Sequence, residues 1–411
     1  MERKLYKNIL ANLERKEYII ITGARQVGKT TILKQISKFL KEQDEPHYYL
    51  TFENPDILNS VNDHPGNILQ FTGFRSQSGE AENGKKITLL IDEVQYHKNP
   101  SNFLKYHYDV NGDWLKIVAT GSSAFYLDTK FKDSLAGRKK IFELFPLDFE
   151  EFLLFKGYPD WKNEWELMRN NHGYTSLPYR EIFILFNEYL TFGGYPAVIL
   201  DKDTEEKKEK LHDLVRTYLK RDVIDTGQSD YLKLIRLLKV LAGQAGQLLN
   251  IHELSNTLRF AGATIENYLY ILQKCYHIHL VPPFYRSLRK ELTKMPKLYF
   301  QDSGFRNSLL NQWQYPDQRL DKGPNIENYL FIRLRQLYGM ESIRYWRTSG
   351  GNEIDFIVTP ESDKEFAMES NYKGDDLKSS KYKIFTAAYP EIPVRIVAYE
   401  TANPSVSLFR L

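Results

Sequence analysis

Three short apolar runs, at residues 18–22, 87–91 and 115–119, dominate the hydrophobic pattern of the first part of the chain. Each run is mostly apolar, with Lys116 as its one charged residue, and leads into a glycine, an acidic pair or a hydroxyl-rich turn, which is typical of strands buried on both faces of a parallel sheet. Residues 5–16 and 29–42 instead show the spacing of amphipathic helices. Strands that alternate with helices predict an α/β unit with a largely parallel sheet.

The hydrophobic pattern changes after Pro146. Residues 147–235 are mostly helical in their periodicity, and residues 247–300 indicate a helix, a turn, a second helix and a hairpin. The last stretch predicts one helix followed by three strands, at 325–338, 343–347, 353–358 and 365–372. We therefore expect four parts, with boundaries at 1–150, 151–235, 236–318 and 319–411.

The composition excludes several classes of protein. The 411 residues carry a formal net charge of only +3, so any surface for nucleic acid or membrane would be a local patch. Cys275 is the only cysteine, which excludes an intramolecular disulfide and a cysteine-based metal cluster and fits the reducing cytoplasm. No run approaches the roughly 18 apolar residues of a membrane span, and the first residues lack the apolar core of a signal peptide. We expect a cytoplasmic protein without a membrane span.

The turn after the first apolar run satisfies the pattern G-x-x-x-x-G-K-[ST], after a strand and at the start of a helix as that pattern requires. Such a turn cradles phosphate oxygens with its backbone N–H groups, and the helix N-terminus adds its positive end. The alternative is a glycine-rich turn without a ligand. We expect the nucleotide to be bound by the turn and the residue after it, which are Gly23, Ala24, Arg25, Gln26, Val27, Gly28, Lys29, Thr30 and Thr31.

Two acids complete the predicted site. Lys29 can reach the β- and γ-phosphates of ATP, and the hydroxyl of Thr30 can bind Mg²⁺. The second apolar run ends in Asp92, which is expected to hold the metal with Thr30, and Glu93, which is expected to orient or activate the attacking water. The alternative is a strand that merely ends in two acids. With ATP and Mg²⁺ as cofactors, the sequence predicts a nucleoside triphosphatase.

The third apolar run ends in a hydroxyl-rich turn that contains Thr120 and Ser122. In a parallel sheet, ligands lie beyond the carboxyl ends of the strands. Ser122 is therefore a candidate to contact the nucleotide by sensing the γ-phosphate. The equal alternative is that the hydroxyls of this turn cap the following helix.

An ordered set of motifs resembles one family nearly from end to end. Besides the phosphate motif and the acids of the second run, the set includes Leu135-Ala-Gly-Arg138, Tyr189-Leu-Thr-Phe-Gly-Gly-Tyr-Pro196, Tyr299-Phe-Gln-Asp-Ser-Gly304 and Glu353-Ile-Asp-Phe356. The chain resembles the prokaryotic AAA-type ATPases that carry an uncharacterised C-terminal region with a restriction-nuclease-like fold. The resemblance implies an AAA-type P-loop core at 1–150, a helical region, a winged-helix-like domain at 236–318 and a small α/β nuclease-like domain at 319–411.

The same resemblance implies ATPase activity in a class that forms oligomers, so we expect a homo-oligomer. In such ATPases an arginine from a neighbouring subunit often completes the active site, and Arg138 is the best-placed candidate for this catalytic role. The alternative is a structural arginine that pairs with a nearby acid.

The helix-turn-helix pattern at 248–272 permits DNA binding, with the second helix in the major groove and the hairpin on phosphates. The hairpin would be basic through Arg286, Arg289, Lys290, Lys294 and Lys297. The alternative is a lid or a protein-docking module. The second helix favours that alternative, because it carries Glu266 and only Lys274 as a basic residue, at its edge.

The nuclease resemblance implies that Glu327, Asp355 and Glu369 gather around Mg²⁺. The family's lysine position is Asn371 here, and Lys373 lies two residues further along the strand, so we expect little or no DNA cleavage. Three functions remain: an ATP-driven switch or motor on a protein or DNA partner, an ATP-regulated DNA endonuclease, and a winged-helix DNA-binding regulator with ATP as a ligand. Asn371 argues against the second, and the pair Asp92 and Glu93 argues against the third.

Overall fold

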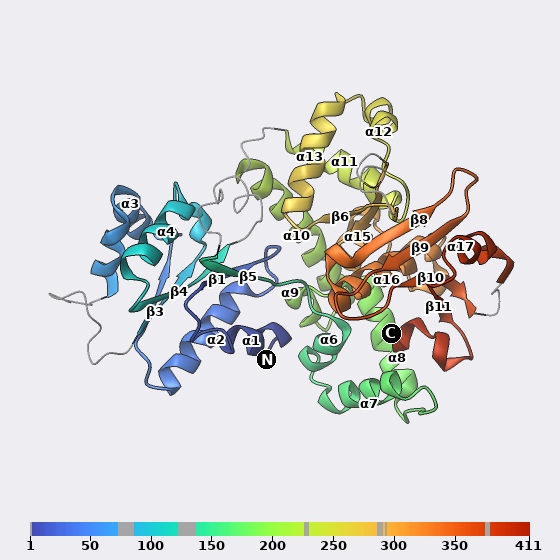
Figure 1. Cartoon of the computed structure of the whole chain (residues 1–411), viewed down its shortest axis with the longest axis horizontal. Coiled ribbons are helices and arrows are strands. Elements are labelled where there is room, and N and C mark those ends of the chain that lie inside the picture. Colours follow the sequence, from blue (N-terminus) through green and yellow to red (C-terminus); the bar gives the residue numbers. More distant parts are fainter. Residues whose placement is uncertain are drawn as a thin grey trace. The chain divides into compact units, whose positions relative to one another are not determined.

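The structure of the protein, a computed structural model, describes residues 2–72, 86–121, 137–225, 230–285, 291, 294–374 and 379–411. It divides the chain into two compact units, which are drawn in Figure 1. The first unit comprises Met1–Phe145 and Lys274–Tyr276, and the second comprises Pro146–Gln273 and His277–Leu411. The boundary coincides with the change in hydrophobic pattern at Pro146. The finer division of the second unit into three domains stays a prediction.

A five-stranded sheet forms the centre of the first unit, and every neighbouring pair of its strands is parallel. In spatial order the strands are β2 (His47–Thr51), β3 (Ile87–Asp92), β4 (Leu115–Gly121), β1 (Tyr18–Thr22) and β5 (Lys139–Glu143). The predicted α/β class is confirmed, and the three predicted strands are the central ones, buried at every residue. The two edge strands escaped prediction because they are only partly buried and carry no continuous apolar run.

Helices cover both faces of this sheet (Figure 1). The helical elements of the first unit are α1 (Lys4–Leu10), α2 (Lys29–Glu42), α3 (Pro55–Asp63), α4 (Pro100–Asn111) and the short 3-10 segments η1 (Pro65–Thr72) and η3 (Val94–Tyr96). Successive residues of a strand point to opposite faces of the sheet. On one face, Ile20 of β1 packs in a core with Phe103 of α4. α2 packs against the strands with Ile32 and Ile36 buried. This packing holds the carboxyl ends of the central strands side by side.

The second unit joins a helical region to a small α/β layer. Its helices are α6 (Phe149–Phe155), α7 (Pro159–Asn170), α8 (Tyr179–Phe192), α9 (Pro196–Ile199), α10 (Thr204–Asp225), α11 (Tyr231–Gly243), α12 (Ile251–Leu258), α13 (Gly262–Lys274), α15 (Ser303–Leu310), α16 (Lys322–Tyr338) and α17 (Lys383–Ala388). In the described part of the chain, no helix combines the length and the apolar character needed to cross a membrane.

Two sheets complete the second unit. One has the order β11 (Val394–Glu400), β10 (Phe366–Lys373), β9 (Glu353–Val358) and β8 (Ile343–Arg347), and the other pairs β6 (Ile278–Val281) with β7 (Lys297–Phe300). In the larger sheet β10 and β11 are parallel, whereas the other pairs are antiparallel. The core packs α6, α7, α8 and α16 against this sheet. The three strands predicted near the C-terminus are present, and β11 was missed because only part of it is buried.

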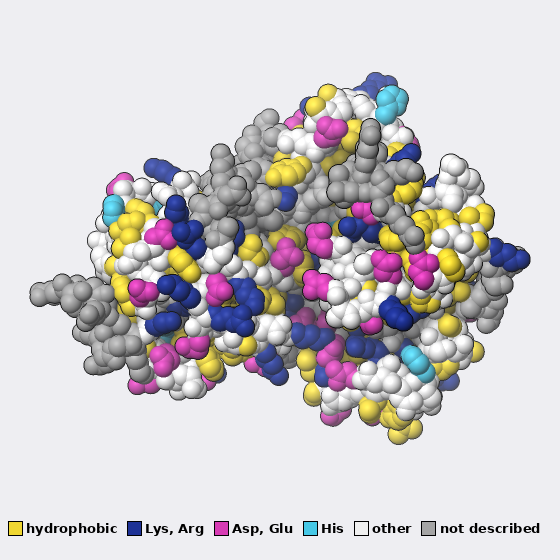
Figure 2. Space-filling view, in the orientation of Figure 1, with side chains coloured by type: hydrophobic (Ala, Val, Ile, Leu, Met, Phe, Trp, Pro, Cys, Tyr) yellow, Lys and Arg dark blue, Asp and Glu magenta, His cyan; other side chains and the backbone are white. Residues whose placement is uncertain are grey.

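The predicted helix-turn-helix elements are present as α12 and α13, and the predicted hairpin is present as β6 and β7. Arg286, Arg289 and Lys290 lie outside the described residues. On the face drawn in Figure 2, basic and acidic side chains are interspersed, in keeping with the net charge of +3. DNA binding by this region therefore stays a prediction.

Candidate nucleotide site and a second acid cluster

The loop that joins β1 to α2 has a left-handed backbone at both glycines of the phosphate motif. Gly23 has a φ of +144° and Gly28 a φ of +103°. A Cβ atom at Gly23 would lie 2.0 Å from the carbonyl oxygen of Leu144, so any side chain there would displace the loop. The loop therefore has the tight strand-to-helix turn that a phosphate cradle requires.

Lys29, in the first turn of α2, is held against this loop. Its side chain is buried, and its Nζ donates hydrogen bonds to the carbonyl oxygens of Gly23 at 3.0 Å and Ala24 at 2.8 Å. These two partners are neutral, so they orient the ammonium without cancelling its charge. A positive charge thus lies at a helix N-terminus, which is the kind of environment that binds phosphate.

Arg3 supports the same loop from a distant part of the chain. Its guanidinium donates one hydrogen bond to the carbonyl oxygen of Val27 and another to that of Phe145, both at 2.7 Å. Arg3 is buried, so the two contacts are shielded from water. Sequence reasoning missed Arg3 because it belongs to no motif and only the fold brings it to the loop.

Asp92, at the carboxyl end of β3, is surrounded by hydroxyl groups. Its Oδ2 accepts hydrogen bonds from Thr30 Oγ1 and from Tyr49 OH, both at 2.9 Å, and its Oδ1 accepts one from Thr120 Oγ1. Tyr49 belongs to β2 and Thr120 to β4, the strands on either side of β3. Burial raises the pKa of the Tyr49 phenol most, and the negative charge of Asp92 raises it further. The phenol therefore stays protonated and remains a hydrogen-bond donor. The two predicted metal ligands, Thr30 and Asp92, thus lie together, and both offer the oxygen atoms that Mg²⁺ prefers.

The backbone of Glu93, directly after β3, has an uncommon conformation. Its φ of 58° and ψ of 48° are left-handed, a conformation that costs on the order of 1 kcal/mol or more in a residue other than glycine. Its N–H donates to Thr120 Oγ1 at 3.0 Å, and its Oε2 accepts a hydrogen bond from Nε2 of Gln95. The turn gives the two neighbouring carboxylates different partners. Gln95, two residues after Glu93, is a site residue that the sequence analysis missed.

Arg138 lies at the end of the sheet where β1 begins, whereas the phosphate loop lies at the other end, where β1 stops. Its carbonyl oxygen accepts a hydrogen bond from the N–H of Tyr18, the first residue of β1, whereas the loop follows the last residue of that strand. A strand of this length spans roughly 15 Å. The Nε of Arg138 pairs with Asp109 at 3.0 Å, as the structural alternative requires. The phosphate loop of its own chain is out of reach, so a catalytic role for Arg138, which stays a prediction, requires a second subunit. Ser122, the predicted γ-phosphate sensor, lies outside the described residues.

The three acids implied by the nuclease resemblance lie near one another in the second unit. Glu327 lies on α16, Asp355 on β9 and Glu369 on β10, and Glu353 of β9 adds a fourth carboxylate; we call these four residues the acid cluster. Oδ2 of Asp355 accepts hydrogen bonds from the backbone N–H and the hydroxyl of Ser370, at 2.9 and 2.8 Å. Burial is the main cause that raises the pKa of Glu327 to about 7 and that of Glu369 to about 8, and the negative charge of Asp355 is the second cause in both residues.

A buried lysine lies among these carboxylates. Nζ of Lys297 is 2.5 Å from Glu353 Oε1 and 2.9 Å from Glu327 Oε1. It also lies 3.8 Å from Asp355 Oδ1, and its side chain is only 1% exposed. Burial alone would lower the pKa of Lys297, but the three carboxylates outweigh it and raise the pKa, so the side chain is an ammonium. The expectation that Lys297 belongs to a DNA-facing basic hairpin was wrong, because β7 is buried along its whole length.

Two further lysines lie on β10 or pair with one of its acids. Lys373, considered as a replacement for the missing lysine at Asn371, is exposed at the end of β10. Lys381, in the short segment η7 (Ser379–Tyr382), forms the ion pair with Glu369 instead. Over the described ranges of the chain, no group of three or more His, Cys, Asp or Glu side chains has the arrangement of a metal site.

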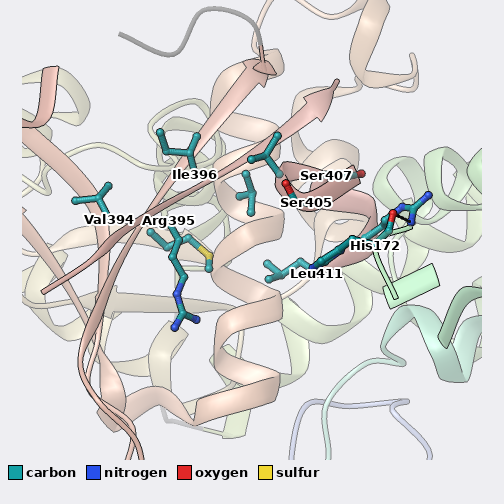
Figure 3. Close-up of a pocket in the computed structure, with 11 residues that line it drawn as sticks. His172, Val394, Arg395, Ile396, Ser405, Ser407 and Leu411 are labelled. Carbon is teal, nitrogen blue, oxygen red and sulfur yellow. Dashed lines mark hydrogen bonds between the residues drawn. The ribbon is translucent and has the colours of Figure 1, made fainter. Parts of the chain in front are cut away.

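A cavity of about 450 Å³ lies beside β11 and the C-terminal turns η8 (Pro404–Val406) and η9 (Leu408–Arg410), as Figure 3 shows. At its edge the guanidinium of Arg410 donates to the carbonyl oxygens of Met168, His172 and Tyr174, at 3.3, 3.2 and 2.9 Å. These hydrogen bonds anchor the C-terminus to the end of α7. The contacts of Arg410 are thus accounted for by the fold, and we assign the cavity no ligand.

Two family models match the chain. The model of the AAA domain matches residues 15–153, and the model of a domain of unknown function (DUF8612) matches residues 184–314. The first match contains the whole five-stranded sheet and the phosphate loop, and it confirms the resemblance to AAA-type ATPases. Residues 319–411 lie outside both matched ranges, so the nuclease-like resemblance of that part stays a prediction.

Similar proteins come from several prokaryotes. The chain is 26% identical to an uncharacterised protein of Methanocaldococcus jannaschii over 92% of this chain and 81% of that protein. It is 28% identical to a second uncharacterised protein of the same organism, over 84% and 73% of the two chains. An uncharacterised protein of Haemophilus influenzae is 26% identical over 87% and 84%. The likeness therefore spans both units, but the names of these relatives supply no activity.

Among solved structures, the Orc1 protein of Aeropyrum pernix in complex with DNA is similar, with 10% identity and a TM-score of 0.34 over 75% of this chain and 92% of that chain. AMPPCP-bound DnaA of Aquifex aeolicus has 15% identity and a TM-score of 0.30, over 66% and 87%. At these values the likeness supports no conclusion about ligands or partners.

Proposed function

We propose that this chain is an AAA-type P-loop ATPase that binds ATP with Mg²⁺ and hydrolyses the ATP to drive a switch or remodelling step on a macromolecular partner. The match of the AAA-domain model to residues 15–153 supports this proposal. Lys29, Thr30 and Asp92 converge where β1 and β3 end, and this convergence is the main support for ATP hydrolysis. A cation, two oxygen ligands and a helix N-terminus in one place match the needs of a magnesium nucleotide.

Each side chain has a distinct task in the proposed reaction. The backbone N–H groups of residues 23–30 and the Lys29 ammonium neutralise the phosphates, and Thr30 and Asp92 would hold Mg²⁺. Bound Mg²⁺ supplies positive charge that stabilises the transferred phosphoryl group. Glu93 accepts a proton from the attacking water or orients that water, and its contact with Gln95 limits the positions its carboxylate can take.

The first test is nucleotide binding. Lys29→Ala is expected to weaken ATP binding roughly 100-fold, because it removes a charge-assisted contact to phosphate. The matched control is Lys34→Ala, which removes an exposed lysine from the same helix. Fluorescent-nucleotide titration measures ATP binding by both variants, and phosphate release measures their hydrolysis. Phosphate release by Lys29→Ala at the parent rate would show that the phosphate loop is not the site of hydrolysis.

The second test concerns the oligomer. We propose that Arg138 of one subunit stabilises phosphoryl charge in the site of another subunit, because its own loop is beyond its reach. Arg138→Ala is expected to bind ATP normally and to hydrolyse it slowly. Mixing it with Glu93→Gln protein should restore part of the activity, because some interfaces then combine an intact arginine with an intact acid. No recovery at any mixing ratio, with subunit exchange verified, would contradict this role.

Two alternatives are weaker. An ATP-regulated DNA endonuclease would need a working metal site in the second unit, and the position of Lys297 disfavours one. A regulator that only binds ATP would not need Glu93 poised beside Asp92. The partner class can be tested by measuring phosphate release with and without DNA, and particle size with and without ATP. DNA cleavage whose rate depends on ATP would favour the ATP-regulated endonuclease.

A further inference from the structure

Independently of the ATPase proposal, the acid cluster of the second unit carries its own cation. A restriction-nuclease-like site gathers carboxylates around Mg²⁺, but here an ammonium lies where those carboxylates converge. We propose that Lys297 occupies the place that a divalent cation would take in this cluster, so that the cluster binds no divalent cation and instead ties together the elements of the second unit. The residues present therefore do not fit the metal that the resemblance implies.

The position of Lys297 is the first support. It begins β7, whereas Glu327 lies on α16 and Glu353 and Asp355 lie on β9, so one ammonium bridges three elements. Its Nζ lies 2.5 to 3.8 Å from an oxygen of each of these three carboxylates. The lysine is almost fully buried, and the ring of Tyr345 lies 5.8 Å from its Nζ. To enter the cluster, a divalent cation would have to displace the side chain of Lys297, which β7 holds in this position.

The carboxylate oxygens are the second support, because protein groups already engage them. Oδ2 of Asp355 accepts two hydrogen bonds from Ser370, and Oε1 of Glu327 accepts one from Tyr299 OH at 2.6 Å as well as that from Lys297. Mg²⁺ requires near-octahedral oxygen coordination at about 2.0–2.1 Å. To build such a shell, the metal would have to break several of these buried hydrogen bonds.

The two outer carboxylates are engaged in the same way. Oε2 of Glu353 pairs with Arg347 at 2.9 Å. Oε2 of Glu369 accepts the backbone N–H of Asp355 at 3.2 Å, and its Oε1 pairs with Lys381. These contacts leave no carboxylate of the cluster without a donor.

The charge balance is the third support. Four carboxylates face the three cations Lys297, Lys381 and Arg347, which leaves one negative charge in excess. The opposite charges within the cluster are therefore almost balanced. A neutral buried network attracts a divalent cation weakly, while removal of one of its cations leaves uncompensated buried charge.

The experiment measures Mn²⁺ binding to the full chain by electron paramagnetic resonance, in an Asp92→Asn background that removes the first unit's metal ligand. The background protein is expected to bind no Mn²⁺ up to about millimolar concentration, which is weaker than ordinary sensor-type cation sites. Lys297→Met, which keeps the length of the side chain without its charge, is expected to gain a Mn²⁺ site at least about 10-fold tighter. Lys297→Met combined with Asp355→Asn should lose it again, and the control Lys383→Met, which removes an exposed lysine outside the cluster, should gain none.

Two outcomes would overturn the proposal. The first is Mn²⁺ binding by the background protein that disappears on Asp355→Asn, a result that does not depend on whether Lys297→Met folds. The second is a folded Lys297→Met protein that binds no Mn²⁺. If Lys297→Met is unstable, its thermal unfolding is expected to shift to higher temperature on addition of Mn²⁺, and the absence of that shift would also count against the proposal.

Discussion

Buried carboxylates have neutral partners in the first unit and a positively charged partner in the second. In the first unit, Asp92 accepts hydrogen bonds from the hydroxyls of Thr30, Tyr49 and Thr120. In the second unit, Glu327 and Glu353 face the ammonium of Lys297. Hydroxyls orient a carboxylate and leave its charge in place, whereas an ammonium cancels that charge. In this protein the partners of the acids, and not the acids alone, distinguish the expected metal site from the acid cluster.

The same contrast extends to the cations. Lys29 donates to backbone carbonyl oxygens, so these contacts aim its charge without neutralising it. Lys297 meets three carboxylates and is neutralised by them. The first arrangement is suited to a ligand that brings its own negative charge, such as a nucleotide with its metal. The second is suited to holding a fold together.

Replacing each central aspartate tests the comparison most strongly. Asp92→Asn is expected to lower the rate of Mg²⁺-dependent ATP hydrolysis roughly 1000-fold, because metal-held charge is worth several kcal/mol in the transition state. Asp355→Asn is expected to leave the rate unchanged. Steady-state phosphate release measures both. A comparable loss in the two variants would remove the distinction between the clusters.

Glu93→Gln separates water activation from metal binding. The variant is expected to bind ATP as tightly as the parent and to hydrolyse it about 10²–10⁴-fold more slowly, because only the proton acceptor is lost. Glu53→Gln, which changes an exposed acid of the same unit, is the control and should have no effect. Single-turnover phosphate release with bound ATP distinguishes the steps, and an unchanged rate would show that Glu93 is not the base.

Tyr49→Phe tests whether the neutral donors prepare Asp92 for the metal. Loss of the phenol hydrogen bond is expected to raise the Mg²⁺ concentration for half-maximal hydrolysis about 10-fold, because such outer partners orient metal ligands. ATP binding without Mg²⁺ should not change. Tyr48→Phe is the matched control, since Tyr48 packs against the apolar core on the other face of β2. Equal Mg²⁺ dependence in the two variants would mean that Tyr49 has only a structural role.

The smallest expected effect concerns pH and the acid cluster. Burial raises the pKa of Glu327 from 4.5 to about 7, so the folded unit holds a proton that the unfolded chain releases. Its contribution to the free energy of unfolding is complete below pH 4.5 and decreases as pH rises towards 7, by at most about 1.4 kcal/mol per pH unit. Glu327→Gln should flatten this decrease, and the exposed Glu361→Gln should not.

Hydrogen exchange of the amides in β9 and β10 measures this decrease, because it reports on the second unit alone. An equal slope in Glu327→Gln and the parent would place the retained proton elsewhere in the cluster.

The nucleotide site was largely predictable, because its key residues lie within two short motifs beside strand ends. The strand before Gly23 and the helix after Gly28 determine the loop locally, and the apolar run before Asp92 places it beside that loop. Tyr49 and Arg3 could not be predicted in the same way. β2 is an edge strand without an apolar run, and Arg3 reaches the loop only through the packing of the first unit.

By itself, the sequence determined the α/β class of the first unit, the phosphate loop and the pairing of Thr30 with Asp92, because strand burial and loop geometry follow from neighbouring residues. Only the tertiary structure decided which counter-charge meets each acid. Lys297 and Glu327 belong to different elements, and a lysine in a predicted hairpin could equally have faced solvent. Burial of β7 brings Lys297 to the acid cluster, and that contact changes the expected chemistry of the second unit.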